Sequence, residues 1–286
     1  SKKSPTVYTY EKRQNAQENA GKYPWARDLK EKAVKEADKI IKQTDVLYDM
    51  IPSEGLPRTM QVGLKNDPSC YACPYCETDL RAEYGSYAWL IDPITEPWKI
   101  QCPQCRRKFP SNDFESYYKA GLDEHGKFNE TLAKENGAEY LKNILYPEMG
   151  ETWGVDDGWG YKTGKMATAT IPEVKTFIAY YQHFGFWHKH SQGGVALIAT
   201  SLNTLKDAYL YTGDSKYGRV GAILIDRIAD FYPEYDLRPY AEIYANSDGG
   251  TGNGKILGSI WECALSTTFA ESYDAFWPAM EDPWVI

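Results

Sequence analysis

The chain has 286 residues, 42% of them hydrophobic, which is enough to build a sizeable core and one or two domains. A formal net charge of −8 disfavours a nucleic-acid-binding protein, because such proteins present a surplus of lysine and arginine. No stretch approaches about 18 consecutive apolar residues, so a membrane span is not expected.

Residues 25–48 predict an amphipathic helix, because apolar residues recur at intervals of three and four with charged residues between them. The expected apolar face comprises Leu29, Ala33, Ala37 and Ile40 or Ile41. Pro52 and Pro57 then lead into an irregular segment. There we expect a small β zinc ribbon, inserted at about residues 66–114.

Two CPxC pairs in that segment predict a metal site. Cys73 and Cys76 precede a gap with room for a hairpin such as YAWLI, and Cys102 and Cys105 follow it. The two-residue spacing lets one tight turn direct both sulfurs at a single ion. Two disulfides are the alternative, and Cys70 is a rival ligand that lacks a CPxC partner. Because four thiolates fill a tetrahedral coordination sphere, we expect a structural Zn²⁺ and not a catalytic one.

Residues 115–170 are rich in glycine and aromatic residues, and we expect them to wrap over the helices without forming a separate domain. Asp156 and Asp157 lie in this passage and Asp248 in a later glycine-rich stretch, and all three are predicted to be solvated loop carboxylates. Cys263 lies in an apolar helical pattern, which predicts a place in the core.

The last third of the chain predicts three successive helices. The first stops at Gly213. Asp214 or Ser215 caps the second, which ends before Pro233, and the third ends before Pro278. The apolar positions are Val195, Ile198, Leu202, Leu205 and Tyr209, then Tyr217, Val220, Leu224, Ile228 and Phe231, then Leu257, Trp261, Leu265, Phe269 and Phe276. Short helix–turn–helix joints favour antiparallel neighbours, so the fold class is mainly α.

The chain contains the runs CPYC, CPQCRRKFPSNDF, GLDEHGKF, LNTLKDAYLYTGDSKYGRVGAILIDRIADFYPEYD and GKILGSIWECALSTTFAESYDAF. Together these runs resemble the heparinase II/III-like polysaccharide lyases, and more closely those that bear an embedded zinc ribbon. The similarity spans most of residues 23–280. It implies an incomplete (α/α) toroid of antiparallel helix hairpins, with residues 1–286 as the N-terminal toroid segment of a longer chain that continues into β-sandwich domains.

The resemblance also implies an activity, the β-elimination of uronic-acid polysaccharides such as glycosaminoglycans or alginate. The family's catalytic asparagine or histidine and its tyrosine have no matching segment before Ile286, so the catalytic residues are unknown and are expected further along. The alternative is a non-catalytic carbohydrate-binding or scaffold module. The expected partners are an acidic polysaccharide and the remainder of the polypeptide. Such a substrate implies a secreted, cell-surface or periplasmic bacterial protein, although thiolate-bound zinc also suits the cytoplasm.

Candidate substrate-binding residues lie in two places. The run YYQHFGFWHKH holds three of the four histidines, and in it we predict that Trp187, His188 and His190 line the substrate. Trp261 and Glu262 open the last predicted helix, where an aromatic ring beside a carboxylate suits a sugar. The competing interpretations are a helix end with solvated histidines for the first place and a core tryptophan for the second.

Overall fold

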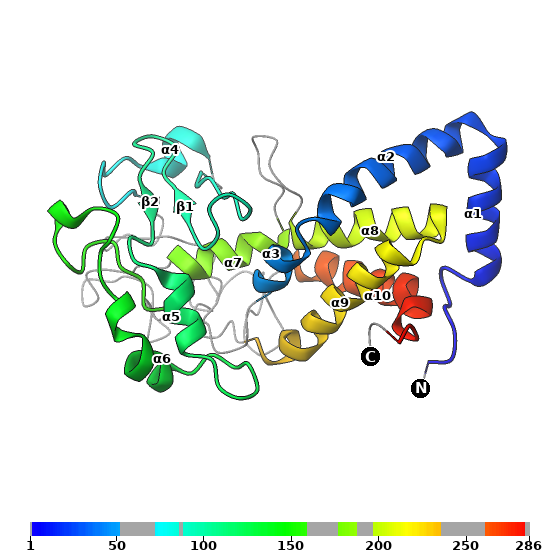
Figure 1. Ribbon diagram of the computed structural model, residues 1–286. Helices are drawn as coiled ribbons and strands as arrows, with labels where there is room; N and C mark the ends of the chain where they lie inside the picture. Colours follow the sequence, from blue (N-terminus) through cyan, green and yellow to red (C-terminus); the bar gives the residue numbers. More distant parts are fainter. Residues whose placement is uncertain are drawn as a thin grey trace.

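The computed structural model describes residues 2–51, 72–85, 88–158, 177–187, 197–235 and 261–283. The described residues are mainly helical, as predicted, with one small two-stranded antiparallel sheet (Figure 1). The α-helices are α1 (Tyr10–Lys22), α2 (Pro24–Ile41), α3 (Thr44–Asp49), α4 (Leu80–Tyr84), α5 (Phe114–Ala120), α6 (Glu130–Gly137), α7 (Phe177–Trp187), α8 (Ile198–Thr212), α9 (Ser215–Phe231) and α10 (Trp261–Met280). The other elements are strands β1 (Ile100–Gln101) and β2 (Lys108–Phe109) and the 3₁₀ turns η1 (Ala138–Tyr140), η2 (Pro147–Met149) and η3 (Tyr232–Glu234).

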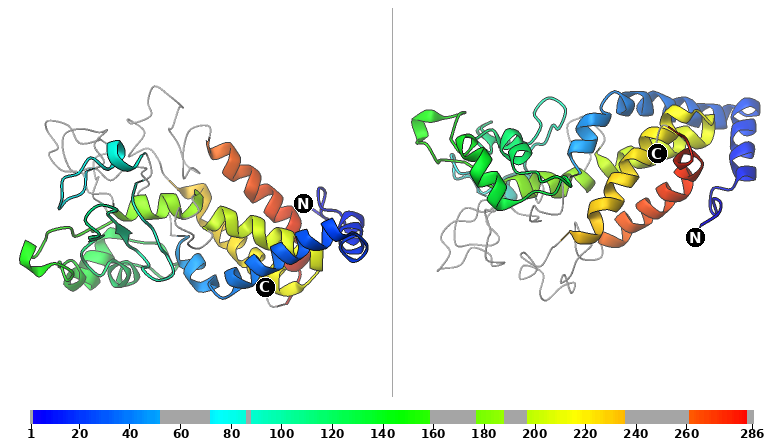
Figure 2. Two further views of the ribbon diagram at one scale, coloured as in Figure 1. Left: turned by 90° about the horizontal axis from the view of Figure 1, so that it is seen from above. Right: turned by 60° about the horizontal axis from the view of Figure 1, so that its bottom comes forward.

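The molecule has two halves that α7 connects (Figure 1, Figure 2). One half contains α1, α2, α8, α9 and α10, and the other contains α4, the sheet, α5 and α6. Helix α7 packs on α8 at one end and on β1 at the other. Within the described ranges, none of the helices has the length and apolar character that a membrane crossing requires.

Helices α8 and α9 form the predicted antiparallel hairpin. Gly213 ends α8 in the left-handed conformation, with a φ of +69°, and its amide donates to the carbonyl of Tyr209 at 2.8 Å. Asp214 then caps α9 by accepting a hydrogen bond of 3.0 Å from the amide of Lys216. Helix α10 packs against both members of the hairpin, and α2 packs against α8. The two joint residues therefore set the geometry of this half.

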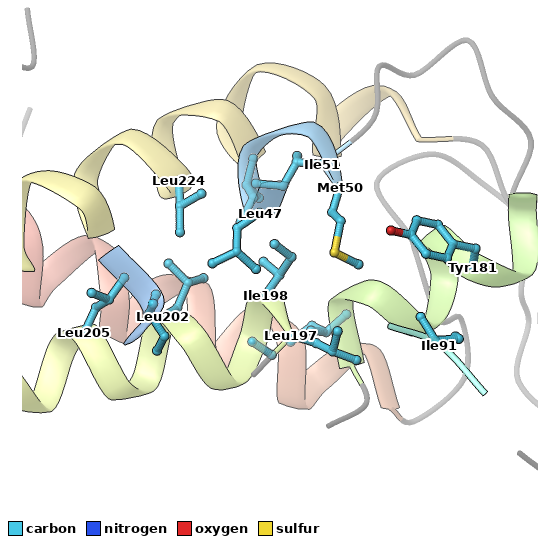
Figure 3. Close-up of a cluster of buried hydrophobic side chains, with 14 of the residues drawn as sticks. Leu47, Met50, Ile51, Ile91, Tyr181, Leu197, Ile198, Leu202, Leu205 and Leu224 are labelled. Carbon is cyan, nitrogen blue, oxygen red and sulfur yellow. The ribbon is translucent and has the colours of Figure 1, made fainter. Parts of the chain in front are cut away.

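The apolar stripe predicted for α9 is buried along its full length. Its members are Tyr217, Val220, Leu224, Ile228 and Phe231. Gly221 allows α9 and α10 to approach closely, because a Cβ at this position would lie 2.2 Å from the ring of Phe276. Figure 3 shows Leu47 of α3 directed toward Ile198 of α8, and Met50, which follows α3, directed into the space between Ile198 and Tyr181 of α7. One continuous core thus joins this half to α7 and the ribbon.

Several predicted details of the helices are wrong. The helix expected over residues 25–48 is divided into α2 and α3, and Leu29 is 45% exposed instead of facing the core. Helix α10 continues through Pro278 to Met280, because a proline in the last turn removes only one backbone hydrogen bond. Cys263 is exposed, because the first turns of α10 bury only Leu265 among the side chains that the structure describes there.

The passage predicted as loops over residues 115–170 contains helices in its described part. Helices α5 and α6 pack on each other and form a second apolar cluster with Ile178 of α7. This passage lies beside the ribbon, away from α8, α9 and α10 (Figure 1). In its described part, residues 88–91, the predicted hairpin segment YAWLI contributes an isolated bridge, from Leu90 to Gln101, next to the β1–β2 pair.

The N-terminal segment is tied to α10 through the buried carboxylate of Asp274. This carboxylate accepts hydrogen bonds from Lys2 and from the amides of Thr6, Val7 and Tyr8, the three amide contacts at 2.7–2.9 Å. Burial would raise the pKa of Asp274, but the hydrogen bonds from Lys2, Tyr8 and Thr6 outweigh it and hold that pKa well below its usual range.

We expect Asp274 to make the stability of the protein depend on pH in acid. The unfolded carboxyl has a pKa of about 3.9, so a lower folded pKa stabilises the protein above that value. The contribution is lost progressively as the pH falls toward the folded pKa. Asp274→Asn should therefore cost about 2 kcal/mol in urea unfolding at pH 7 and less at pH 3. An equal difference between variant and parent at the two pH values would contradict this assignment.

Candidate metal centre

Four sulfur atoms meet at one point of the ribbon. The Sγ atoms of Cys73, Cys76, Cys102 and Cys105 all lie within 4.8 Å of one another. The distance is 3.6 Å from Cys73 to Cys105 and 3.9 Å from Cys76 to Cys102. Four sulfurs at about 2.3 Å from a central tetrahedral ion lie about 3.8 Å apart, which agrees with both distances. The four predicted cysteines can therefore hold a metal ion.

The disulfide alternative is wrong for this arrangement. A disulfide bond is about 2.05 Å long, and all four cysteines are free thiols. Cys70, the rival ligand that the prediction leaves out of the site, lies outside the described residues, so its exclusion stays a prediction.

The two CPxC turns have the same local structure. In each, the amide that follows the second cysteine donates to the carbonyl of the first, from Glu77 to Cys73 and from Arg106 to Cys102, both at 3.0 Å. Glu77 and Arg106 have positive φ values of 54° and 63°. The repeated turn directs both sulfurs of a pair to the same side, which is how two segments separated in sequence build one site.

The sulfurs influence one another's protonation. The hydrogen bond from the Cys73 thiol lowers the pKa of Cys102 to about 5 against the effect of burial. The same hydrogen bond, followed by burial, raises the pKa of Cys73. A binding cation has to displace the thiol protons, so metal affinity should fall as the pH is lowered. Because four sulfurs complete a tetrahedral shell, the site has no position for water or substrate and suits a structural ion.

The ribbon is joined to the rest of the protein by the buried run that follows β2. Phe109 is fully buried and stacks on Phe177 at the start of α7, with ring centroids 5.0 Å apart. Two residues further on, the amide of Ser111 donates to the carbonyl of Gly154 at 2.7 Å. The Asn112 side chain donates to the carbonyl of Asp156 at 3.0 Å, and accepts from its amide at the same distance. The run FPSNDF thus fixes the loop at residues 154–156.

Asp156 links this loop to α7, contrary to the prediction of a solvated carboxylate. Its side chain is buried and accepts hydrogen bonds of 2.8 Å from the amides of Gly158 and Ile178. Ile178 is the second residue of α7, so the carboxylate caps that helix. Lys99 lies near enough to Asp156 to interact with it, and burial lowers the pKa of Lys99 to about 8 against the effects of Asp113, Glu96 and Asp156. The sequence carried no local signal of this burial.

An aromatic clasp around Arg107 holds the first CPxC turn. The guanidinium lies 3.6 Å from the ring centroid of Tyr75, within that turn, and 4.4 Å from that of Tyr146. Arg107 also donates to Glu148 at 3.4 Å. Tyr146 in turn accepts a hydrogen bond of 2.7 Å from the amide of Lys108. The clasp connects both CPxC turns to the η2 loop.

The candidate substrate-binding residues stay predictions. Trp187 is the last described residue of α7, and Trp261 and Glu262 are the first described residues of α10, but their side chains lie outside what the structure describes. His188 and His190 lie outside the described residues altogether, as does Asp248. From the same predicted run, Tyr180 and Tyr181 are each only 1% exposed, so they contribute to packing and do not line a groove.

The chain was compared with models of known protein families, with curated proteins and with solved structures, and none of the three comparisons finds a match.

Proposed function

We propose that the chain is the N-terminal helical part of a heparinase II/III-like polysaccharide lyase that cleaves uronic-acid polymers by β-elimination. One combination of features carries the proposal. A four-sulfur site is attached to a stack of antiparallel helices, in a chain whose ribbon–FPSNDF run and helix–TGD–helix joint resemble this family. The alternative is a carbohydrate-binding or scaffold module with the same helices and no turnover.

The ion in the four-sulfur site is, in this proposal, Zn²⁺. A tetrahedral set of four thiolates suits both Zn²⁺ and iron. Zn²⁺ has no redox chemistry, which fits a purely structural role. The ion supplies no chemistry to the elimination step. Its role is to hold the ribbon in a fixed shape, so that FPSNDF and Asp156 position the start of α7.

The proposed arrangement of the helices is an incomplete (α/α) toroid that the remainder of the polypeptide completes. An apolar groove of about 480 Å³ between α9, η3 and α10 supports this. It is lined chiefly by Ile225, Ile228, Tyr232, Phe269, Ala270 and Met280. In a stack of helix hairpins, each exposed apolar face is covered by the next pair. We therefore propose that a further hairpin of the longer polypeptide covers this groove, as an accompanying β-sandwich domain would cover other faces.

The chemistry sets clear demands on the missing catalytic groups. β-Elimination removes the C5 proton of a uronate, next to its carboxylate, and expels the 4-linked sugar oxygen. The carboxylate charge must be neutralised for this. A base must also reach the C5 proton, and an acid must reach the leaving oxygen. We assign no catalytic residue in this chain. In the proposal, Trp187, His188, His190, Trp261 and Glu262 bind substrate, and the protein acts on polysaccharide outside the bacterial cytoplasm.

Product formation tests the proposal. The chain, and a version extended past Ile286, would be incubated with alginate and with hyaluronan while ultraviolet absorbance is recorded. We expect the absorbance of a new C4=C5 double bond from the extended version, and none from this chain alone, since the catalytic groups lie further along. Polymer binding without any unsaturated product from either version would support the scaffold alternative instead.

A further inference from the structure

Two exposed aromatic rings are stacked in parallel where α1 meets α2. Tyr23 and Trp25 are 48% and 58% exposed, and their ring centroids lie 6.2 Å apart with the planes only 16° from parallel. Pro24, the first residue of α2, stiffens the backbone between them. Single exposed aromatics are ordinary on protein surfaces, but a parallel Tyr–Trp pair presents an apolar face with polar edges. Such a face suits the ring of a pyranose sugar.

The same end of the molecule carries a surplus of positive charge in an otherwise acidic protein. Residues 1–35 contain nine lysines and arginines against four aspartates and glutamates, a net charge of +5. Since the whole chain carries −8, the remaining residues carry −13. An acidic polymer should therefore be attracted more to this segment than to the rest of the chain, although Lys2 and Lys22 are already paired with Asp274 and Glu18.

Individual cations lie close to the aromatic pair along the helix. The Arg27 guanidinium donates to the carbonyl of Gly21 at 3.2 Å, which keeps it at the corner between α1 and α2. Lys32 and Lys35 are exposed, and neither makes an ion pair with another residue that the structure describes. Lys32 follows Trp25 by two helical turns, about 10 Å along the axis on the same side of α2.

We infer that the α1–α2 corner is an accessory binding surface for uronic-acid polysaccharide. Tyr23 and Trp25 stack on sugar rings, and Arg27, Lys32 and Lys35 pair with the carboxylates that repeat along the polymer. The inference takes its polymer class from the proposed function and adds where the polymer is held. The corner lies at the end of the helical half farthest from the ribbon (Figure 1), so the polymer would bind there without touching the metal centre.

Affinity electrophoresis of the chain in gels containing alginate, hyaluronan or uncharged dextran tests the surface. We expect the parent to be retarded by both acidic polymers and not by dextran, with retardation that weakens as salt rises. The double variant Tyr23→Ala/Trp25→Ala should lose about tenfold in affinity for alginate, and so should Lys32→Glu/Lys35→Glu. Because all four side chains are exposed, the melting temperatures of both variants should match the parent's.

Matched controls come from the other half of the molecule. Tyr84→Ala removes an aromatic ring that is 44% exposed on α4, and Lys142→Glu reverses an exposed charge, and neither should change affinity. Unchanged binding by Tyr23→Ala/Trp25→Ala would overturn the inference, and so would an equal loss in the controls. Both double variants would also be tested for binding to single-stranded RNA and to anionic phosphatidylserine vesicles. Losses equal to the loss of alginate binding would show a general polyanion surface and overturn the sugar assignment.

The proposed function is tested separately, by the formation of unsaturated product. If the extended version forms product and both double variants bind alginate normally, only the inference of an accessory surface is rejected. Loss of alginate binding in the variants, with no product from any version, would support the surface and reject the lyase.

Discussion

Cys102→Ser should release the bound metal and destabilise the protein by at least about 4 kcal/mol, because metal binding and folding of such a site are coupled. Cys102 is fully buried and its sulfur lies among three others, so a serine hydroxyl there cannot replace a thiolate ligand. The expected readouts are elemental analysis of the purified protein, with about one zinc per chain in the parent and little in the variant, and a melting temperature lower by roughly 10 °C or more.

Cys263→Ser is the matched control, since Cys263 is a free and exposed thiol on α10, outside the four-sulfur cluster. It should leave metal content and melting temperature unchanged. A parent that contains iron in place of zinc would keep the site and correct the metal. Full metal content and an unchanged melting temperature in Cys102→Ser would show that the four sulfurs do not hold the ion.

The four-sulfur cluster was predictable because each CPxC motif determines its own turn within a few residues. Each CPxC turn forms by itself, and a four-coordinate ion then requires the two turns to meet, so spacing alone predicts the cluster. The α8–α9 hairpin was predictable for a similar reason. Gly213 is suited to the left-handed end of α8 and Asp214 to the start of α9, and both signals act within a few residues.

Other features depend on contacts that sequence spacing does not show. The glycine-rich sequence around Asp156 suggests a solvated loop. Its hydrogen-bond partners Asn112 and Ile178, however, are 44 and 22 residues away in the chain. Helix α1 has little apolar character and was not predicted. Its Arg13 side chain donates hydrogen bonds to the nearby carbonyl of Tyr8 and to the carbonyl of Ala275 in α10, and the second of these holds the helix to a distant segment. In both cases a buried polar group is satisfied by backbone from a distant segment.

The four sulfurs, FPSNDF and Asp156 form one chain of contacts from the ribbon to α7. Asn112 exchanges two hydrogen bonds with the backbone of Asp156, and the Asp156 carboxylate accepts from the amide of Ile178. The ribbon thus acts on the helical half through polar contacts as well as through Phe109. This arrangement makes Asp156 the residue whose loss should loosen the contact between the ribbon and the start of α7 while leaving the four-sulfur site intact.

Asp156→Ala should cost about 3–5 kcal/mol in urea unfolding, because it removes two hydrogen bonds to a charged group and leaves the amides of Gly158 and Ile178 without their partner. Asp156→Asn keeps one acceptor oxygen and should cost roughly half as much. Metal content should stay at the parent level in both variants, which distinguishes this effect from loss of the four-sulfur site. Hydrogen exchange should be faster at the amides that begin α7 and slow, as in the parent, within the CPxC turns.

Glu151→Ala is the matched control, since Glu151 is an acid of the same loop. Its side chain is 71% exposed and forms a long ion pair of 3.8 Å with Lys142. Its cost should be below about 0.5 kcal/mol. If Asp156→Ala costs no more than Glu151→Ala, the carboxylate does not hold α7. If Asp156→Ala also loses the metal, the four sulfurs need the contact with α7 in order to stay together. The ribbon would then depend on the helical half for its own folding.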